Sequence, residues 1–302
     1  MRLGLCLSCF GDVSLPESIR WAGQSGFEAV EIPSPPVRGG PEWFEAGGLN
    51  VAALTGPNRD AFMAALDDAG LKAAALAWYA NMLDPDDRRR DAAWEHLGRT
   101  VDAAATLGID LVALAVGRNP AATLGECVAE FARRARPLVE KAEAGGVRLA
   151  IENDPACGRD VEDLPGNAAF SPELWEKLFS AIRSPALGLA LDPSHLVWLG
   201  IDPVTAVTDY AEKVFHVHAA DVEIFDARRQ DCSILRPSGG WFRYRLPGLG
   251  SVDWRRFLDR LQELGYEGSI CIKQQDPVWS GDLDKIKAGA TLARRHLVQF
   301  LP

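Results

Sequence analysis

The feature that most constrains this chain is a recurrence of short apolar runs separated by helical stretches. The runs are rich in Val, Ile, Leu and Ala, and they occupy residues 3–8, 29–32, 72–77, 111–116, 147–152, 187–192, 214–219 and 269–273. Runs that are apolar throughout indicate parallel strands buried on both faces. Amphipathic helical periods lie between them, and a glycine closes five of the helical stretches, at Gly26, Gly70, Gly108, Gly146 and Gly265.

Eight such units predict an α/β fold, a closed (β/α)8 TIM barrel, forming a single domain over residues 1–302. A chain of 302 residues that is 47% hydrophobic suits one large barrel. An open, doubly wound sheet is the alternative. The segment after the first strand, "SCFGDVS" (8–14), has neither the dinucleotide nor the P-loop glycine spacing, so we expect no nucleotide cofactor.

Charge and composition exclude several classes of protein. Acidic residues outnumber basic ones 42 to 32, giving a formal charge of −10, so we expect no binding to nucleic acid or to an anionic membrane. The N-terminus, "MRLGLCLSCF", lacks the pattern of a signal peptide, and no run has the length of a membrane span. We therefore expect a cytoplasmic protein. Its oligomeric state is left open, a homodimer included.

The six cysteines are too sparse for a disulfide scaffold. Cys6 and Cys9 form a Cys-x-x-Cys, but odd spacing on a strand directs two side chains to opposite faces. We interpret them as packed thiols rather than as a metal or redox pair.

Two long loops interrupt the regular pattern. One spans residues 153–172 after the fifth strand, and the other spans residues 221–252 after the seventh. Both follow the carboxyl ends of strands, where barrel enzymes build their sites.

Polar side chains end several predicted strands. His216 and His218 are two residues apart and share one strand face, while Glu152 and Asp192 end their own strands and His195 follows Asp192 by three residues. Unpaired buried carboxylates are costly, which favours a functional cluster over chance. Two carboxylates and an imidazole suit a divalent cation such as Mn²⁺, Mg²⁺, Co²⁺ or Zn²⁺, so Glu152, Asp192 and His218 are candidate ligands.

Other residues are candidates for contact with a substrate. Glu31 closes the second strand and is as well explained by a salt bridge near the rim. Trp198 could stack on a sugar ring, although core packing explains an aromatic residue equally well. Arg243 and Arg245 could hold a polyhydroxylated or anionic ligand, with surface salt bridges as the alternative. His216, on the face of His218, completes this predicted set.

Five segments make the chain similar to a known family: "AIEN" (150–153), "LDPSHLVWLGIDP" (191–203), "FHVHAADVE" (215–223), "FRYRLPGLGSVDW" (242–254) and "YEGSICIKQQDPVW" (266–279). The chain resembles the xylose isomerase-like TIM barrels, especially the sugar phosphate isomerase/epimerase group, along nearly its whole length. The resemblance implies a divalent metal held by Glu152, Asp192, His218 and a glutamate at position 273. It also implies that His195 contacts a substrate hydroxyl or a water.

The fourth position departs from the family, because it holds Lys273. Family members commonly read Glu-His-Glu-Asp-Pro where this chain reads "KQQDP" (273–277), and Ala220 replaces a frequent lysine. An ammonium about 4 Å from a divalent ion is repelled by about 8 kcal/mol at an effective dielectric constant of about 20. Lys273 therefore either deprotonates and serves as a general base beside the ion, or replaces the ion as a cation. A Schiff base with a carbonyl substrate has no specific support. We expect metal binding to be weak or absent.

The resemblance implies an enzyme acting on a sugar or polyol by proton transfer next to a carbonyl, with Glu152, Lys273 and His195 as catalytic residues. An elimination on a sugar-like substrate is the alternative, because it tolerates the loss of one glutamate better than a symmetrical epimerisation does. A descendant that binds a sugar-like ligand without catalysis is the rival from another class. An endonuclease IV-like role is disfavoured by the acidic balance and by only five histidines.

Overall fold

The barrel of this protein is described by a computed structural model that covers residues 1–37, 40–45, 47–156, 165–234 and 240–301. Eight parallel strands form a closed sheet in the order β1, β12, β9, β8, β7, β6, β5 and β2. They span Arg2–Cys6 (β1), Ala29–Pro33 (β2), Lys72–Trp78 (β5), Leu111–Leu114 (β6), Arg148–Glu152 (β7), Leu187–Leu191 (β8), Val214–Ala219 (β9) and Ser269–Ile272 (β12). The predicted TIM barrel and its eight strands are confirmed.

The first strand is shorter than predicted. It ends at Cys6, the last residue that pairs with β2, and the chain then turns into a 3-10 helix, η1 (Leu7–Phe10), which buries Leu7 and Phe10. Cys9 therefore lies off the strand, and our argument that the two thiols occupy opposite faces of one strand is wrong. Both cysteines are free, and Cys6 is buried while Cys9 is partly buried.

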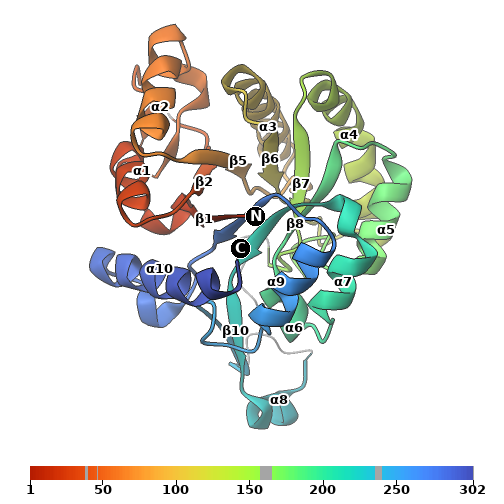
Figure 1. Ribbon diagram of the computed structural model, residues 1–302. Coiled ribbons are helices and arrows are strands. Elements are labelled where there is room, and N and C mark those ends of the chain that lie inside the picture. Colours follow the sequence, from red (N-terminus) through yellow and green to blue (C-terminus); the bar gives the residue numbers. More distant parts are fainter. Residues whose placement is uncertain (38–39, 46, 157–164, 235–239, 302) are drawn as a thin grey trace.

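Helices surround the barrel, as Figure 1 shows. The α-helices span Leu15–Gln24 (α1), Gly56–Asp68 (α2), Asp87–Leu107 (α3), Leu124–Ala144 (α4), Pro172–Ala181 (α5), Pro193–Trp198 (α6), Pro203–Asp209 (α7), Asp226–Cys232 (α8), Trp254–Glu263 (α9) and Leu283–Leu297 (α10). Gly108 caps α3 with φ at 68°, and its N–H bonds back to Ala104 and Ala105. Glycine adopts this left-handed conformation without strain, which explains the recurrent glycine between helix and strand.

The predicted loop 221–252 contains regular structure. Strands β10 (Asp221–Ile224) and β11 (Phe242–Arg245) form an antiparallel pair, and α8 projects from the barrel between them (Figure 1). A smaller pair, β3 (Phe44–Glu45) and β4 (Gly48–Leu49), follows β2. Of the other predicted loop, 153–172, residues 157–164 lie outside the described residues.

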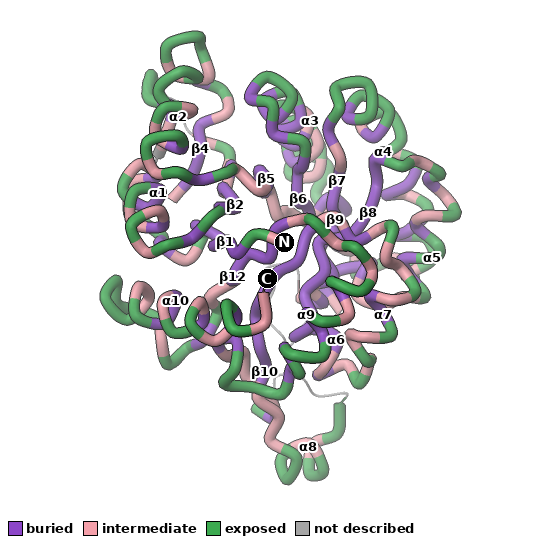
Figure 2. The backbone as a smooth tube through the Cα atoms, in the orientation of Figure 1, coloured by how far each residue is buried: buried purple, intermediate pink, exposed green. Residues whose placement is uncertain are grey.

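The main core lies between the strands and the helices, and its largest fully buried side chains include Phe62, Phe131, Trp175 and Phe257. Figure 2 shows the strands buried and the outer helix faces exposed. A separate apolar cluster is built mainly of alanines, Ala75, Ala77, Ala113, Ala150 and Ala190, with Leu111. Within the described residues, no helix combines the length and the apolar character needed to cross a bilayer.

Candidate active site

The predicted strand-end residues meet at the carboxyl end of the barrel. Glu152 is the last residue of β7, Asp192 directly follows β8, His218 is in β9, and Lys273 directly follows β12. Glu152 is 2% exposed, Asp192 and His218 are fully buried, and the side chain of Lys273 is 12% exposed. Parallel barrel strands deliver their carboxyl ends to one rim, so residues far apart in sequence become neighbours.

A continuous line of ionisable groups crosses this end of the barrel. Lys273 Nζ contacts Glu152 Oε1, and the same oxygen lies 2.8 Å from His218 Nδ1. The other ring nitrogen, His218 Nε2, lies 2.7 Å from Glu31 Oε2. His216 Nε2 lies 3.0 Å from that oxygen of Glu31, although without hydrogen-bond geometry. Glu31 therefore belongs to this network, not to a surface salt bridge.

The opposite charges of these neighbouring ionisable groups stabilise one another. Burial alone would lower the pKa of Lys273, but the carboxylates of Glu152, Asp154 and Asp192 outweigh it and raise that pKa above its usual value. Burial would raise the pKa of Glu152, yet Lys273 and His218 hold it well below its usual range. Lys273 is therefore an ammonium and Glu152 a carboxylate.

His218 lies between two carboxylates. Burial opposes its positive charge, but Glu31 and Glu152 raise the pKa of His218 well above its usual value. His218 in turn is the main cause that holds the pKa of buried Glu31 below its usual range. Burial lowers the pKa of His216, which is therefore neutral. An ammonium, two carboxylates and an imidazolium sum to zero charge, which limits the cost of burial.

Sequence reasoning missed two residues of the site. The hydroxyl of Tyr79, just after β5, donates to Glu31 Oε1 at 3.2 Å and lies 3.2 Å from His218 Nε2. Cys6 contributes a sulfur to a group with Glu31 and His218 whose donor atoms lie within 4.8 Å of one another. The position of Tyr79 at a strand end is the signal that could have found it.

A second group surrounds Asp192. Its Oδ1 accepts hydrogen bonds from Ser194 N (2.9 Å) and Ser194 Oγ (2.6 Å). Its Oδ2 lies 3.5 Å from His195 Nε2, and neither atom has a hydrogen-bond partner among the described residues. His195 Nδ1 is 2.8 Å from the hydroxyl of Tyr244 in β11, which fixes the ring. Two buried polar atoms thus remain available to a ligand.

The predicted metal ligands separate into two groups. Donor atoms of Glu152 and Asp192 lie within 4.8 Å of one another together with His195, while His218 groups with Cys6 and Glu31. Lys273 Nζ already contacts Oε1 of Glu152. One predicted metal ligand, Glu152, is therefore already paired with the ammonium of Lys273.

The remaining predicted substrate contacts lie around the β10–β11 hairpin. Trp198 is 4% exposed and stacks on Phe242, with ring centroids 4.5 Å apart. Arg243 Nε pairs with Glu223 at 2.6 Å. Arg245 pairs with Glu223 at 2.7 Å and with buried Asp276 at 2.8 Å. These contacts are the packing and salt bridges that the sequence left open as alternatives.

The comparisons with known proteins agree with this architecture. The sequence profile of the xylose isomerase-like TIM barrel family matches residues 19–296, so the chain belongs to that family. The uncharacterized protein YfiH of Bacillus subtilis is 25% identical over 310 residues, covering 91% of this chain and 93% of YfiH.

Two further relatives carry names of enzymes. An inosose dehydratase of Clostridium botulinum is 28% identical over 123 residues, covering 39% of this chain and 41% of the dehydratase. Among solved structures, the apo form of the 3-keto-D-glucoside 4-epimerase YcjR from E. coli has a TM-score of 0.71 at 16% identity, and the match covers 99% of each chain. The structural likeness establishes the shared fold.

Proposed function

We propose that this protein is an enzyme that isomerises or epimerises a sugar or polyol by moving a proton next to a carbonyl group. The observation that carries the proposal is the salt bridge between Lys273 and Glu152, which holds an ionised carboxylate and an ammonium acid together at the carboxyl end of the barrel. This end is where barrel enzymes perform their chemistry. The named epimerase and dehydratase relatives support the class of substrate.

Glu152 would act as the base. Lys273 and His218 both contact Oε1, and no hydrogen bond among the described residues engages Oε2. Oε2 can take the proton from the carbon next to the carbonyl once the carbonyl oxygen draws the ammonium of Lys273 from Oε1, because that contact lowers the pKa of Glu152. Returning that proton to the neighbouring carbon, while Lys273 gives a proton to the carbonyl oxygen and takes one from the adjacent hydroxyl, completes an isomerisation. His218 and Glu31 would hold the carboxylate of Glu152 in place.

Lys273 would act as the acid. Its ammonium can donate a hydrogen bond to the carbonyl oxygen and stabilise the negative charge that develops there in the enolate. An epimerisation also needs a proton donor on the other face of the carbon, and Lys273, in direct contact with Glu152, lies on the same side as the base. His195 Nε2 and Asp192 Oδ2, which have no hydrogen-bond partner among the described residues, would bind hydroxyl groups of the substrate.

We propose further that Lys273 takes the place of the family's divalent metal. Its ammonium contacts Glu152 directly, and three carboxylates hold its charge. A divalent ion on Glu152 would be repelled by this ammonium, so the residues present do not fit the family's metal, and none of the steps above uses one.

A dehydration is the second candidate. One base and one acid side by side are what an elimination needs: Glu152 removes the proton from the carbon next to the carbonyl, and Lys273 protonates the departing hydroxyl, which leaves as water. The inosose dehydratase relatives favour the same reaction class.

Proton exchange tests these proposals. The protein is incubated in D2O with a panel of ketoses, aldoses and inososes, and the substrates are followed by proton NMR. Deuterium entering next to the carbonyl, abolished in Glu152→Gln, supports the proposal. A new sugar identifies an isomerase or epimerase, and an unsaturated product identifies a dehydratase. Ligand binding without any exchange across the panel would instead mean a sugar-binding protein without catalysis.

A further inference from the structure

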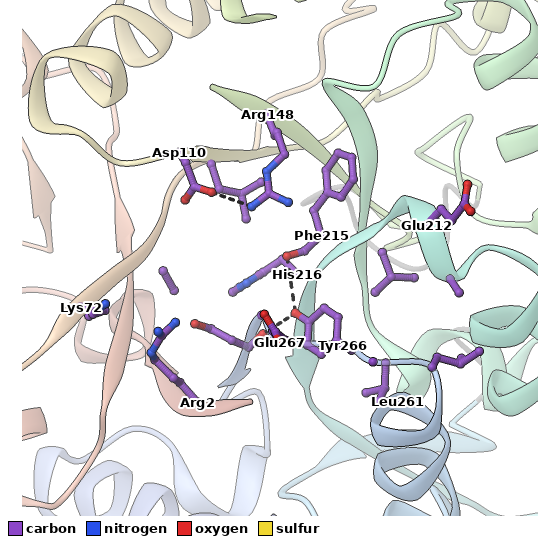
Figure 3. Close-up of a pocket in the computed structure, with 18 of the residues that line it drawn as sticks. Arg2, Lys72, Asp110, Arg148, Glu212, Phe215, His216, Leu261, Tyr266 and Glu267 are labelled. Carbon is purple, nitrogen blue, oxygen red and sulfur yellow. Dashed lines mark hydrogen bonds and ion pairs between the residues drawn. The ribbon is translucent and has the colours of Figure 1, made fainter. Parts of the chain in front are cut away.

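A cavity of about 610 Å³ opens at the other end of the barrel. It is lined by the first residues of the barrel strands, including Arg2 of β1, Lys72 of β5 and Arg148 of β7 (Figure 3). The proposed catalytic residues are at the opposite, carboxyl end of the same strands. The cavity is thus separate from the site described above.

Two of the lining cations have no partner. Among the described residues, the side chains of Arg2 and Lys72 make no ion pair and no hydrogen bond. Arg148 pairs with Asp110 at 2.6 Å and stands over the ring of Phe215 at 4.9 Å. The other acidic lining residues are Glu212 and Glu267.

Strand register brings the two free cations to the same part of the wall. Lys72 pairs with Ala29 of β2, and Ala29 also pairs with Gly4 of β1. Lys72 and Arg2 thus flank the start of β2, with backbones about 12 Å apart, which long side chains can bridge to hold one anion. Figure 3 shows both on one side of the cavity.

Polar groups line the rest of the cavity. His216 lines the cavity but is only 1% exposed, and its Nε2 lies 3.0 Å from Glu31 on the side of the catalytic end. The hydroxyl of Tyr266 donates to the carbonyl of Ser269 at 2.8 Å and can still accept a hydrogen bond. A hollow with two free cations and polar walls suits a small, charged and hydroxylated molecule better than an apolar one.

We propose that this cavity binds the phosphate group of a small molecule between Arg2 and Lys72. The guanidinium of Arg2 matches phosphate oxygens in pairs, and the ammonium of Lys72 adds a second charge. The volume admits a molecule the size of a sugar phosphate, with a hydroxyl group toward the hydroxyl of Tyr266. This site lies outside the proposed function and does not depend on it.

Calorimetry tests the proposal with inorganic phosphate and glucose 6-phosphate as the probes. Saturable binding is expected for the wild type and should weaken about tenfold in Lys72→Glu and in Arg2→Ala, because each removes a charged contact. Lys285→Glu is the matched control, since Lys285 is an exposed lysine on α10 and the charge change is identical. It should bind as the wild type does.

A further variant tests whether phosphate binding is independent of the carboxyl end of the barrel. Lys273→Met removes the ammonium of the proposed catalytic site and should leave phosphate binding unchanged. Tighter binding of the ester than of inorganic phosphate identifies a phosphorylated metabolite as the occupant, and equal binding identifies free phosphate. The proposal is overturned if neither probe binds, if Lys285→Glu weakens binding as much as Lys72→Glu, or if Lys273→Met loses binding although circular dichroism shows that it is folded.

Discussion

Lys273 Nζ and Glu152 Oε1 form a salt bridge between the ends of β12 and β7, 121 residues apart in sequence. Lys273 occupies the position where the resemblance implies a metal-ligating glutamate. It contacts Glu152, which the resemblance implies is another ligand of the same ion. The pair therefore sets both the charge of the site and the chemistry that it can support.

Lys273→Glu should create a metal site. The variant gains a fourth ligand, its third carboxylate, and loses the competing ammonium, so we expect near-stoichiometric divalent metal after dialysis against Mn²⁺, Mg²⁺, Co²⁺ or Zn²⁺, measured by inductively coupled plasma mass spectrometry. The wild type should retain far less. Lys273→Gln, which removes the charge without adding a carboxylate, should be intermediate. Stoichiometric metal in the wild type would contradict the replacement of the ion by Lys273.

Lys273→Met should destabilise the fold by about 3–5 kcal/mol in urea unfolding, because Glu152 is left as an unpaired buried charge. Lys285→Met, at an exposed position, should change stability by less than about 0.5 kcal/mol. The double variant Lys273→Met/Glu152→Gln should recover part of the loss, since the unpaired charge is gone. Additive losses would mean that the two residues do not interact.

The stability of the protein should depend on pH through His218. Its pKa is raised in the folded protein, so its stabilisation is complete below its ordinary pKa of 6.5 and is lost as pH rises through the folded value. The pKa values of Glu31 and Glu152 are lowered, so their stabilisation is present above the ordinary value of 4.5 and is lost as pH falls through the folded values. The urea concentration at the midpoint of unfolding should therefore be highest between the lowered pKa values of the two glutamates and the raised pKa of His218. It should fall at lower and at higher pH.

His218→Gln isolates the histidine. The difference in urea midpoint between wild type and variant should narrow as pH rises from about 7 to about 10, because only the wild type loses the imidazolium. A difference that stays constant over this range would show that His218 is neutral in the folded protein.

Arg243 and Arg245 differ in the burial of their partners. Arg245→Ala should cost about 1–3 kcal/mol, because it removes the guanidinium that pairs with fully buried Asp276. Arg243→Ala should cost less than about 1 kcal/mol, because its pair with Glu223 is solvent-exposed. Urea unfolding measures both. If the arginines instead bind substrate, both variants should raise KM. The difference between the unfolding free energies of the two variants should then be absent.

Much of the fold could be predicted from the sequence because local signals carry it. Continuous apolar runs at 111–114 and 187–191 between amphipathic helical stretches are typical of strands buried on both faces, and the glycine at 108 indicates the end of a helix. Strand ends were less certain, as at Cys6, because nothing local distinguishes a final strand residue from the first residue of a 3-10 helix.

The sequence by itself determined the barrel and the polar strand ends, and the resemblance implied a glutamate at the position of Lys273. Only the tertiary structure decided which side chains contact one another. His218 lies between Glu31 and Glu152, Tyr79 contacts Glu31 and His218, and Arg245 pairs with Asp276. The physical reason is that side-chain periodicity is a local property of one strand. The register between strands, which places those side chains against one another, depends on how the whole sheet closes.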